Sequence, residues 1–173
     1  MALLELINLR KIRKAIFYLI CIVVAVWLQT MVLSRRGLLG VKPFFLPALV
    51  VAIGMFEGGV WGALLGIAAG IGCDLAMSDS TVLFLVLFAV CGFLSGVLTQ
   101  FFINRTFFSG MLLSVLALAF TALCQIVPLW IFQGTAPGPL FSVAGLQVLW
   151  SLPFAVLCFF VVKLIAGRQS ERY

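Results

Sequence analysis

A few carboxylates lie inside the apolar part of the sequence, at positions where an ionisable side chain often has a functional role. Between Pro43 and Asn104 the formally charged residues are Glu57, Asp74 and Asp79. A carboxylate at membrane depth is costly, so such residues bind ligands, relay protons or pair with other groups. We favour a structural role for Asp74, in which it bonds a neighbouring helix end or a cation; ligand binding and proton relay are the alternatives. The candidate cations are those of Arg35, Arg36 and Lys42.

The other reactive side chains offer little for catalysis. The chain has no histidine, which removes the commonest general base and metal ligand. Ser95 lies between Gly92 and Gly96 without an accompanying base, so it is interpreted as a packing residue. The five cysteines are scattered through apolar runs without Cys-x-x-Cys spacing, which argues against a metal site or a disulfide framework. The sequence therefore predicts a protein that is not an enzyme and has no catalytic residue, cofactor or metal.

A row of glycines at helical spacing leads to Asp74. The glycines recur at every fourth residue, and a further step of four reaches the aspartate. Small residues let helix backbones approach closely in a bilayer, where packing replaces the hydrophobic effect. Because each step of four turns by about 400°, the row winds by roughly 160°, and two neighbouring helices are expected to share it. The row comprises Gly58, Gly62, Gly66 and Gly70.

A second pair of glycines, Gly92 and Gly96, repeats this spacing once and makes its helix a candidate neighbour of the row. The interpretation that we favour is packing within the subunit. The alternatives are a partner subunit's helix lying against the glycines and a small-molecule pocket. The glycines of both sets, together with Asp74, are our candidate helix-packing or partner-binding residues.

These residues belong to a chain of 173 residues that is 65% hydrophobic and 9% charged, whereas soluble domains carry about a quarter charged residues. Apolar runs of about 20 residues are typical of membrane-spanning helices. We therefore predict a single all-α polytopic membrane domain of about six helices. The expected ranges are 15–33, 42–56, 58–77, 81–103, 107–132 and 141–166.

The second and third expected helices share too few residues for two full crossings, so a short hairpin turning at Glu57, Gly58 and Gly59 is predicted. Pro43 suits the first turn of the second helix. Pro47 lies deeper and can bend it.

The net charge of +6 comes from basic residues that flank the apolar runs. This placement is typical of cytoplasmic segments facing anionic lipid and not of nucleic-acid binding. With six spans, the positive-inside rule places eight basic residues inside and three outside, which favours cytoplasmic termini. Residues 1–14 are a basic segment that can lie along the membrane surface. Residues 15–166 then form the bundle, and residues 167–173 a cytoplasmic tail.

Three short elements occur in order along the chain. They are Leu28, Gln29 and Thr30 near the end of the first span, Gly40, Lys42 and Pro43 at the start of the second, and Gly66, Gly70 and Asp74 in the third. Together they resemble the rod shape-determining protein MreD family, and the length, the basic flank and the six spans fit as well. The resemblance covers nearly the whole chain. Residues 78–82 (Ser-Asp-Ser-Thr-Val) depart from the Ser/Gly loop and Pro-Leu-Gly-like element often found there in the family.

The resemblance implies a non-enzymatic scaffold subunit of the bacterial cell-elongation machinery, located in the inner (cytoplasmic) membrane, that maintains rod shape. Such a subunit binds the bitopic protein MreC and helps couple MreB filaments to peptidoglycan synthesis by RodA and its transpeptidase. The family is also similar in architecture to the substrate-binding subunits of energy-coupling-factor vitamin transporters, which supplies the alternative function.

A vitamin-binding subunit would need several convergent polar and aromatic side chains toward the outer face. The candidates for such a pocket are Asp74, Trp27, Gln29 and Trp130. Because polar groups are few in the expected spans, the scaffold is the function that we favour.

Overall fold

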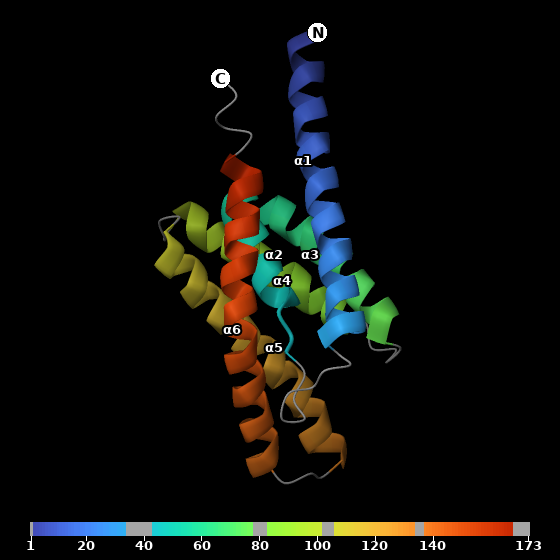
Figure 1. The fold of residues 1–173 in the computed structure, drawn as a ribbon, viewed down its shortest axis with the longest axis vertical. Helices are drawn as coiled ribbons and strands as arrows, with labels where there is room; N and C mark the ends of the chain where they lie inside the picture. Colours follow the sequence, from blue (N-terminus) through green and yellow to red (C-terminus); the bar gives the residue numbers. More distant parts are fainter. Residues whose placement is uncertain (1, 34–42, 78–82, 102–105, 134–136, 168–173) are drawn as a thin grey trace.

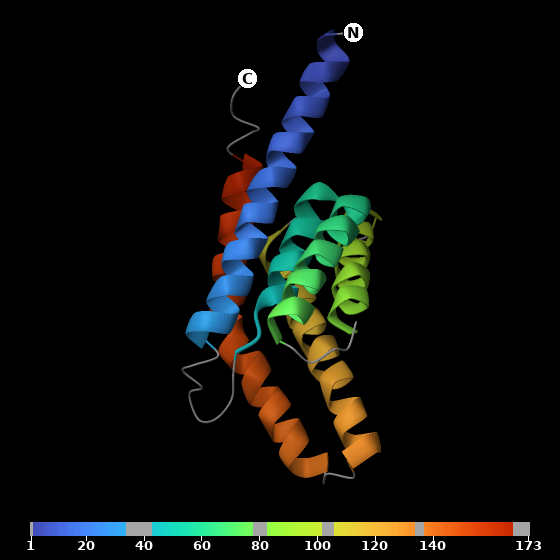
Figure 2. The same cartoon turned by 90° about the vertical axis from the view of Figure 1, so that its right-hand side faces the viewer.

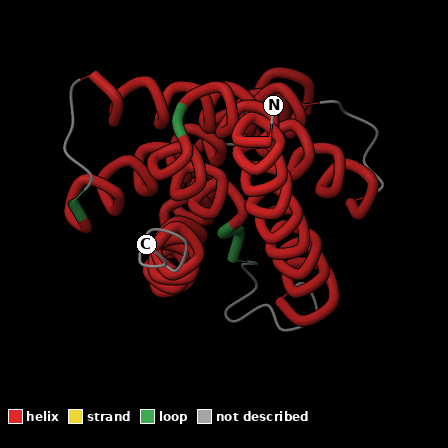
Figure 3. The backbone as a smooth tube through the Cα atoms, turned by 90° about the horizontal axis from the view of Figure 1, so that it is seen from above, coloured by secondary structure: helices red, strands yellow, loops and turns green. Residues whose placement is uncertain are grey.

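A computed structural model describes residues 2–33, 43–77, 83–101, 106–133 and 137–167. Figure 3 shows that these parts of the chain are almost entirely helical, with no strand among them. The elements are α1 (Ala2–Trp27), the π-helical segment η1 (Leu28–Leu33), α2 (Leu46–Glu57), α3 (Gly59–Met77), α4 (Leu83–Phe101), α5 (Phe107–Gln133) and α6 (Pro137–Gly167).

Within the described residues, five helices are long and apolar enough to cross a membrane. These helices are α1 and α3 to α6. The remaining helix, α2, has 12 residues, so it is about 18 Å long, well short of the ~30 Å hydrocarbon core of a bilayer. The chain is therefore a multi-pass membrane protein, and its second helix is shorter than the expected range 42–56.

The short helix α2 lies at the centre of the bundle. Its hydrophobic residues from Leu46 to Met55 are at most 2% exposed, and it contacts α3, α4, α5 and α6. It begins at Leu46, after residues 43–45, which are not helical. Pro47 thus occupies its first turn. Proline is tolerated there, because a backbone N–H in the first turn has no hydrogen-bond partner within the helix. Our expectations that Pro43 opens this helix and that Pro47 lies deep enough to bend it were wrong.

The turn between α2 and α3 has the predicted position. Gly58 separates the two helices with a φ of +96°, a conformation that favours glycine. Its backbone N–H donates to the carbonyl of Gly54 at 2.9 Å and closes α2. The short hairpin expected at Glu57, Gly58 and Gly59 is confirmed.

The first residues of α1 and the last of α6 lie at the same end of the molecule (Figures 1 and 2). There α1 projects beyond the bundle as one continuous helix, because no glycine or proline interrupts it between Ala2 and Trp27. Residues 2–14 and the apolar residues that follow them therefore form one helix. At the opposite end, α5 and α6 extend past the ends of α1, α3 and α4.

Candidate functional site

The glycine row of α3 packs mainly against α4, and one of its members also meets α2. A Cβ atom built on Gly66 would lie 2.9 Å from the carbonyl carbon of Phe88, and one built on Gly70 would lie 2.8 Å from the nitrogen of Leu85. Our prediction that this helix neighbours the row is confirmed. The prediction that two helices share the row is also confirmed, because a Cβ on Gly62 would lie 2.7 Å from the Cα of Gly54 in α2 as well as against α4.

Glycines on both helices form the closest part of this crossing. A Cβ on Gly62 would lie 3.0 Å from the carbonyl carbon of Gly92, and one on Gly92 would lie 2.7 Å from that of Gly62. Gly96 meets the turn, where its Cβ would lie 2.5 Å from the carbonyl carbon of Gly58. A Cβ on Gly58 itself would meet nothing within 4 Å. Gly58 therefore forms the turn and does not pack on α4. Gly59 occupies the position against α4 that we expected Gly58 to occupy.

Asp74 ends the row beside the first turn of α4. Its Oδ2 atom accepts a hydrogen bond from the backbone N–H of Leu85 at 3.3 Å. N–H groups in a first turn have no intrahelical partner, and the positive end of a helix favours a carboxylate. The predicted bond to a neighbouring helix end is confirmed; the three candidate cations lie outside the described residues. Within those residues, Oδ1 of Asp74 is buried and has no hydrogen-bond partner.

Gln29 holds the non-helical entry to α2. It lies in η1 and is 3% exposed. Its Nε2 donates to the carbonyl of Pro43 at 2.6 Å, and its Oε1 accepts from the N–H of Phe45 at 3.3 Å. Backbone groups outside a helix need such partners inside a membrane. The sequence singled out Gln29 and Pro43 separately, and the structure brings them into contact; Lys42 lies outside the described residues.

A third backbone group of the same entry is satisfied from α6. The N–H of Phe44 donates to Oγ of Ser151 at 2.9 Å, and the Ser151 hydroxyl donates to the carbonyl of Gln147 at 2.7 Å. Sequence reasoning missed Ser151, since it is 107 residues from Phe44. A lone hydroxyl in an apolar helix usually bonds its own backbone, as Thr121 does.

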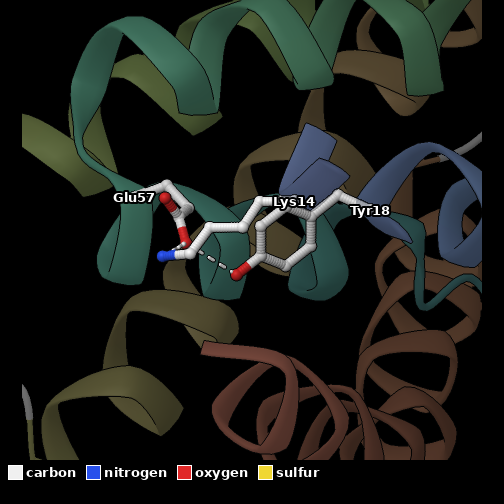
Figure 4. A network of polar contacts seen from close by, with 3 residues as sticks. All are labelled: Lys14, Tyr18 and Glu57. Carbon is white, nitrogen blue, oxygen red and sulfur yellow. Dashed lines mark hydrogen bonds and ion pairs between the residues drawn. The ribbon is translucent and has the colours of Figure 1, made fainter. Parts of the chain in front are cut away.

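At the other end of α2, Glu57 is bound by two residues of α1 (Figure 4). Its Oε1 lies 3.4 Å from Nζ of Lys14 and accepts a hydrogen bond from the Tyr18 hydroxyl at 2.9 Å. Tyr18 is 1% exposed. Lys14 and Tyr18 are four residues apart and so share one face of α1, a spacing that could have indicated this contact. Helix α1 thus holds the end of α2 at Glu57, whereas η1 and α6 hold its entry.

The remaining sequence candidates do not converge on one site. Trp27 is 59% exposed, whereas Gln29 is buried with both sides of its amide bonded. The side chain of Trp130 lies outside the described part of the structure. The Ser95 hydroxyl donates to the carbonyl of Gly92 at 3.0 Å. Among the described residues, no group of three His, Cys, Asp or Glu residues could hold a metal ion.

These contacts define the class of protein. It is a multi-pass α-helical membrane protein in which a short buried helix is held by polar side chains from the first and last helices. Comparisons with protein-family models, curated proteins and solved structures return no match for the chain.

Proposed function

We propose that this chain is a non-enzymatic scaffold subunit of the bacterial cell-elongation machinery, of the MreD type. In this proposal it lies in the inner membrane with both termini in the cytoplasm, and its bundle is similar to that of energy-coupling-factor substrate-binding subunits. It binds MreC and helps couple MreB filaments to peptidoglycan synthesis by RodA and its transpeptidase.

The observation that carries the proposal is the use of the intramembrane polar side chains. Gln29, Ser151 and Asp74 each bond the backbone of another element of the same bundle. A catalyst or a vitamin carrier needs convergent polar groups that are available to a substrate. A scaffold needs a rigid bundle with a defined surface, and these bonds contribute to rigidity.

The residues that carry the family resemblance also set the shape of the bundle. Gln29 contacts Pro43, and the series Gly66, Gly70 and Asp74 packs on α4. Substitutions at these positions should therefore alter the packing of the bundle and not a catalytic or ligand-binding step. The proposal requires such a role, because a scaffold subunit acts by presenting a defined surface to its partner.

The test is a detergent pull-down of the tagged protein from native membranes, with partners identified by mass spectrometry. Recovery of MreC and elongation proteins from the wild type, and their loss with Gly66→Leu, would support the scaffold. Gly145→Leu on α6 is the matched control, because a Cβ there would meet nothing within 4 Å. Recovery of an ATP-driven coupling subunit in place of MreC would contradict the proposal.

A further inference from the structure

The N-terminal part of α1 continues the first span beyond the bundle. The helix runs without a break from Ala2 to Trp27, and Figures 1 and 2 show its first turns projecting past the other helices. Its apolar span reaches back to Arg13, so residues 2–12, the projection, add about 17 Å of helix to that span. The headgroup region of a bilayer is about 5–8 Å thick on each side. The first two turns of α1 therefore reach beyond the headgroups.

The projection is anchored directly at its base. Lys14 and Tyr18 of α1 both contact Oε1 of Glu57, at 3.4 Å and 2.9 Å. The projection leads into this anchor within the same continuous helix. A segment that is already helical and fixed at one end loses little conformational freedom when it binds a partner. The projection is therefore well suited to present a recognition surface.

Large aliphatic residues gather on one side of the projection. At 100° per residue, five such positions fall within an arc of about 220°, whereas Glu5, Asn8 and Ile12 occupy the rest of the circle. A contiguous apolar surface of this kind outside the lipid is typical of an interaction site. This apolar stripe comprises Leu3, Leu4, Leu6, Ile7 and Leu9.

The basic residues of the next turn lie on the same side of the helix as the apolar stripe. In a helix that lies along a membrane, the basic residues belong to the polar face, opposite the apolar one. Here the two kinds of residue follow one another along a single side. This order fits a helix that projects from the membrane better than one that lies on it. The basic residues within the arc are Arg10, Lys11, Arg13 and Lys14.

The charges also indicate the chemistry of the occupant. A second copy of this chain would bring its own four basic residues against these four, and like charges at an interface are unfavourable. Glu5, the acidic residue of the projection, lies on the other side of the helix. Leu3, Leu6 and Ile7 have the i, i+3, i+4 spacing of residues by which a helix enters an apolar groove. The complementary surface is thus a groove with an apolar floor and an acidic rim.

We propose that the projection of α1 docks into an apolar groove with an acidic rim on a protein outside the membrane, on the side where the two termini lie. The apolar stripe enters the groove, and the basic residues of the following turn pair with the rim. The inference goes beyond the proposed function, because it assigns no surface to MreC and does not require MreC.

The first test locates the partner by photocrosslinking in cells. A benzoylphenylalanine replaces Ile7 in the full chain, and the matched control replaces Glu5, which is two residues away on the opposite side of the helix. We expect a protein adduct at position 7 that is several-fold stronger than at position 5, with the crosslinked partner peptide close to Asp and Glu residues. An adduct at position 7 with lipid or a second copy of the chain alone, equal protein adducts at both positions, or no adduct would overturn the proposal.

The second test addresses the acidic rim. Arg10→Gln and Asn8→Glu each lower the net charge by one, but position 10 lies in the arc of the apolar stripe and position 8 lies outside it. Arg10→Gln should reduce the yield of the position-7 adduct by about threefold, and Asn8→Glu should leave it unchanged. Equal losses in the two variants would show that the contact follows net charge alone, as attraction to anionic lipid does, and would overturn the acidic rim.

The two proposals can fail separately. Recovery of MreC in the pull-down, together with only lipid adducts at position 7, would remove this surface and leave the scaffold function standing. A side-specific protein adduct at position 7 without recovery of MreC would remove the scaffold function and leave this surface standing.

Discussion

Gly70→Ala tests the closeness of α3 and α4. The added methyl carbon would lie 2.8 Å from the nitrogen of Leu85 and 2.8 Å from the carbonyl oxygen of Phe84. The Cα of Leu85 would lie closer still, and ordinary contact begins at 3.4 Å, so the helices must separate by more than 0.6 Å at this point. Both opposing atoms belong to the backbone and cannot move aside as a flexible side chain would.

The separation has two energetic consequences. Overpacking of this kind costs about 1–3 kcal/mol. The hydrogen bond from Leu85 to Asp74, now 3.3 Å, would lengthen to about 3.9 Å and be lost, at about 1 kcal/mol. Alanine regains about 1 kcal/mol of helix propensity. We therefore expect Gly70→Ala to lower the free energy of unfolding by about 1–3 kcal/mol.

The assay is unfolding by dodecyl sulfate in mixed micelles, followed by tryptophan fluorescence. Gly145→Ala is the matched control, since a Cβ there meets no atom within 4 Å, and it should be neutral or stabilising by up to about 1 kcal/mol. Equal stability of the two variants would refute the reasoning, because it would mean that α3 and α4 do not approach as closely as the glycines indicate.

Three further predictions use the same unfolding assay. Gln29→Leu should cost about 2–4 kcal/mol, because it leaves a buried carbonyl and a buried N–H unpaired at the entry to α2; a cost below 1 kcal/mol would contradict this role. Asp74→Asn keeps an acceptor for the α4 backbone and should change stability by less than about 1 kcal/mol, whereas Asp74→Leu should cost more; the reverse order would favour a role for the charge. Tyr18→Phe removes a buried hydrogen bond to a carboxylate and should cost about 1.5–3 kcal/mol, and Lys14→Met, which removes a part-exposed ion pair, less than about 1 kcal/mol; a larger effect for Lys14 would show that the ion pair dominates.

The parts of the fold that could be predicted from the sequence are those with a local signal. Long apolar runs gave the helices, and the Gly58 turn followed from the small number of residues available for two helices. The spacing of Gly92 and Gly96 matched the glycine row and gave the pairing of α3 with α4. Each of these depends on residue types and intervals within one or two neighbouring segments.

The contacts of α2 could not be predicted in this way. Ser151 bonds Phe44 across 107 residues, and Tyr18 bonds Glu57 across 39. No periodicity within a segment encodes such a pair. The sequence also gave no sign that α2 begins at Leu46, because residues 43–45 are as apolar as the helix that follows them. Their non-helical backbone is possible only because distant side chains satisfy it.

The bond between Phe44 and Ser151 also bears on how the chain is made. At a synthesis rate of about 5–20 residues per second, the serine leaves the ribosome about 5–20 s after the phenylalanine. During that interval α2 is too short to be inserted as an independent span, and its entry lacks one of its partners. We therefore expect α2 to reach its final place only when α6 arrives, late in biosynthesis. A chain released after α5 would keep this defect and be a natural substrate for membrane quality-control proteases.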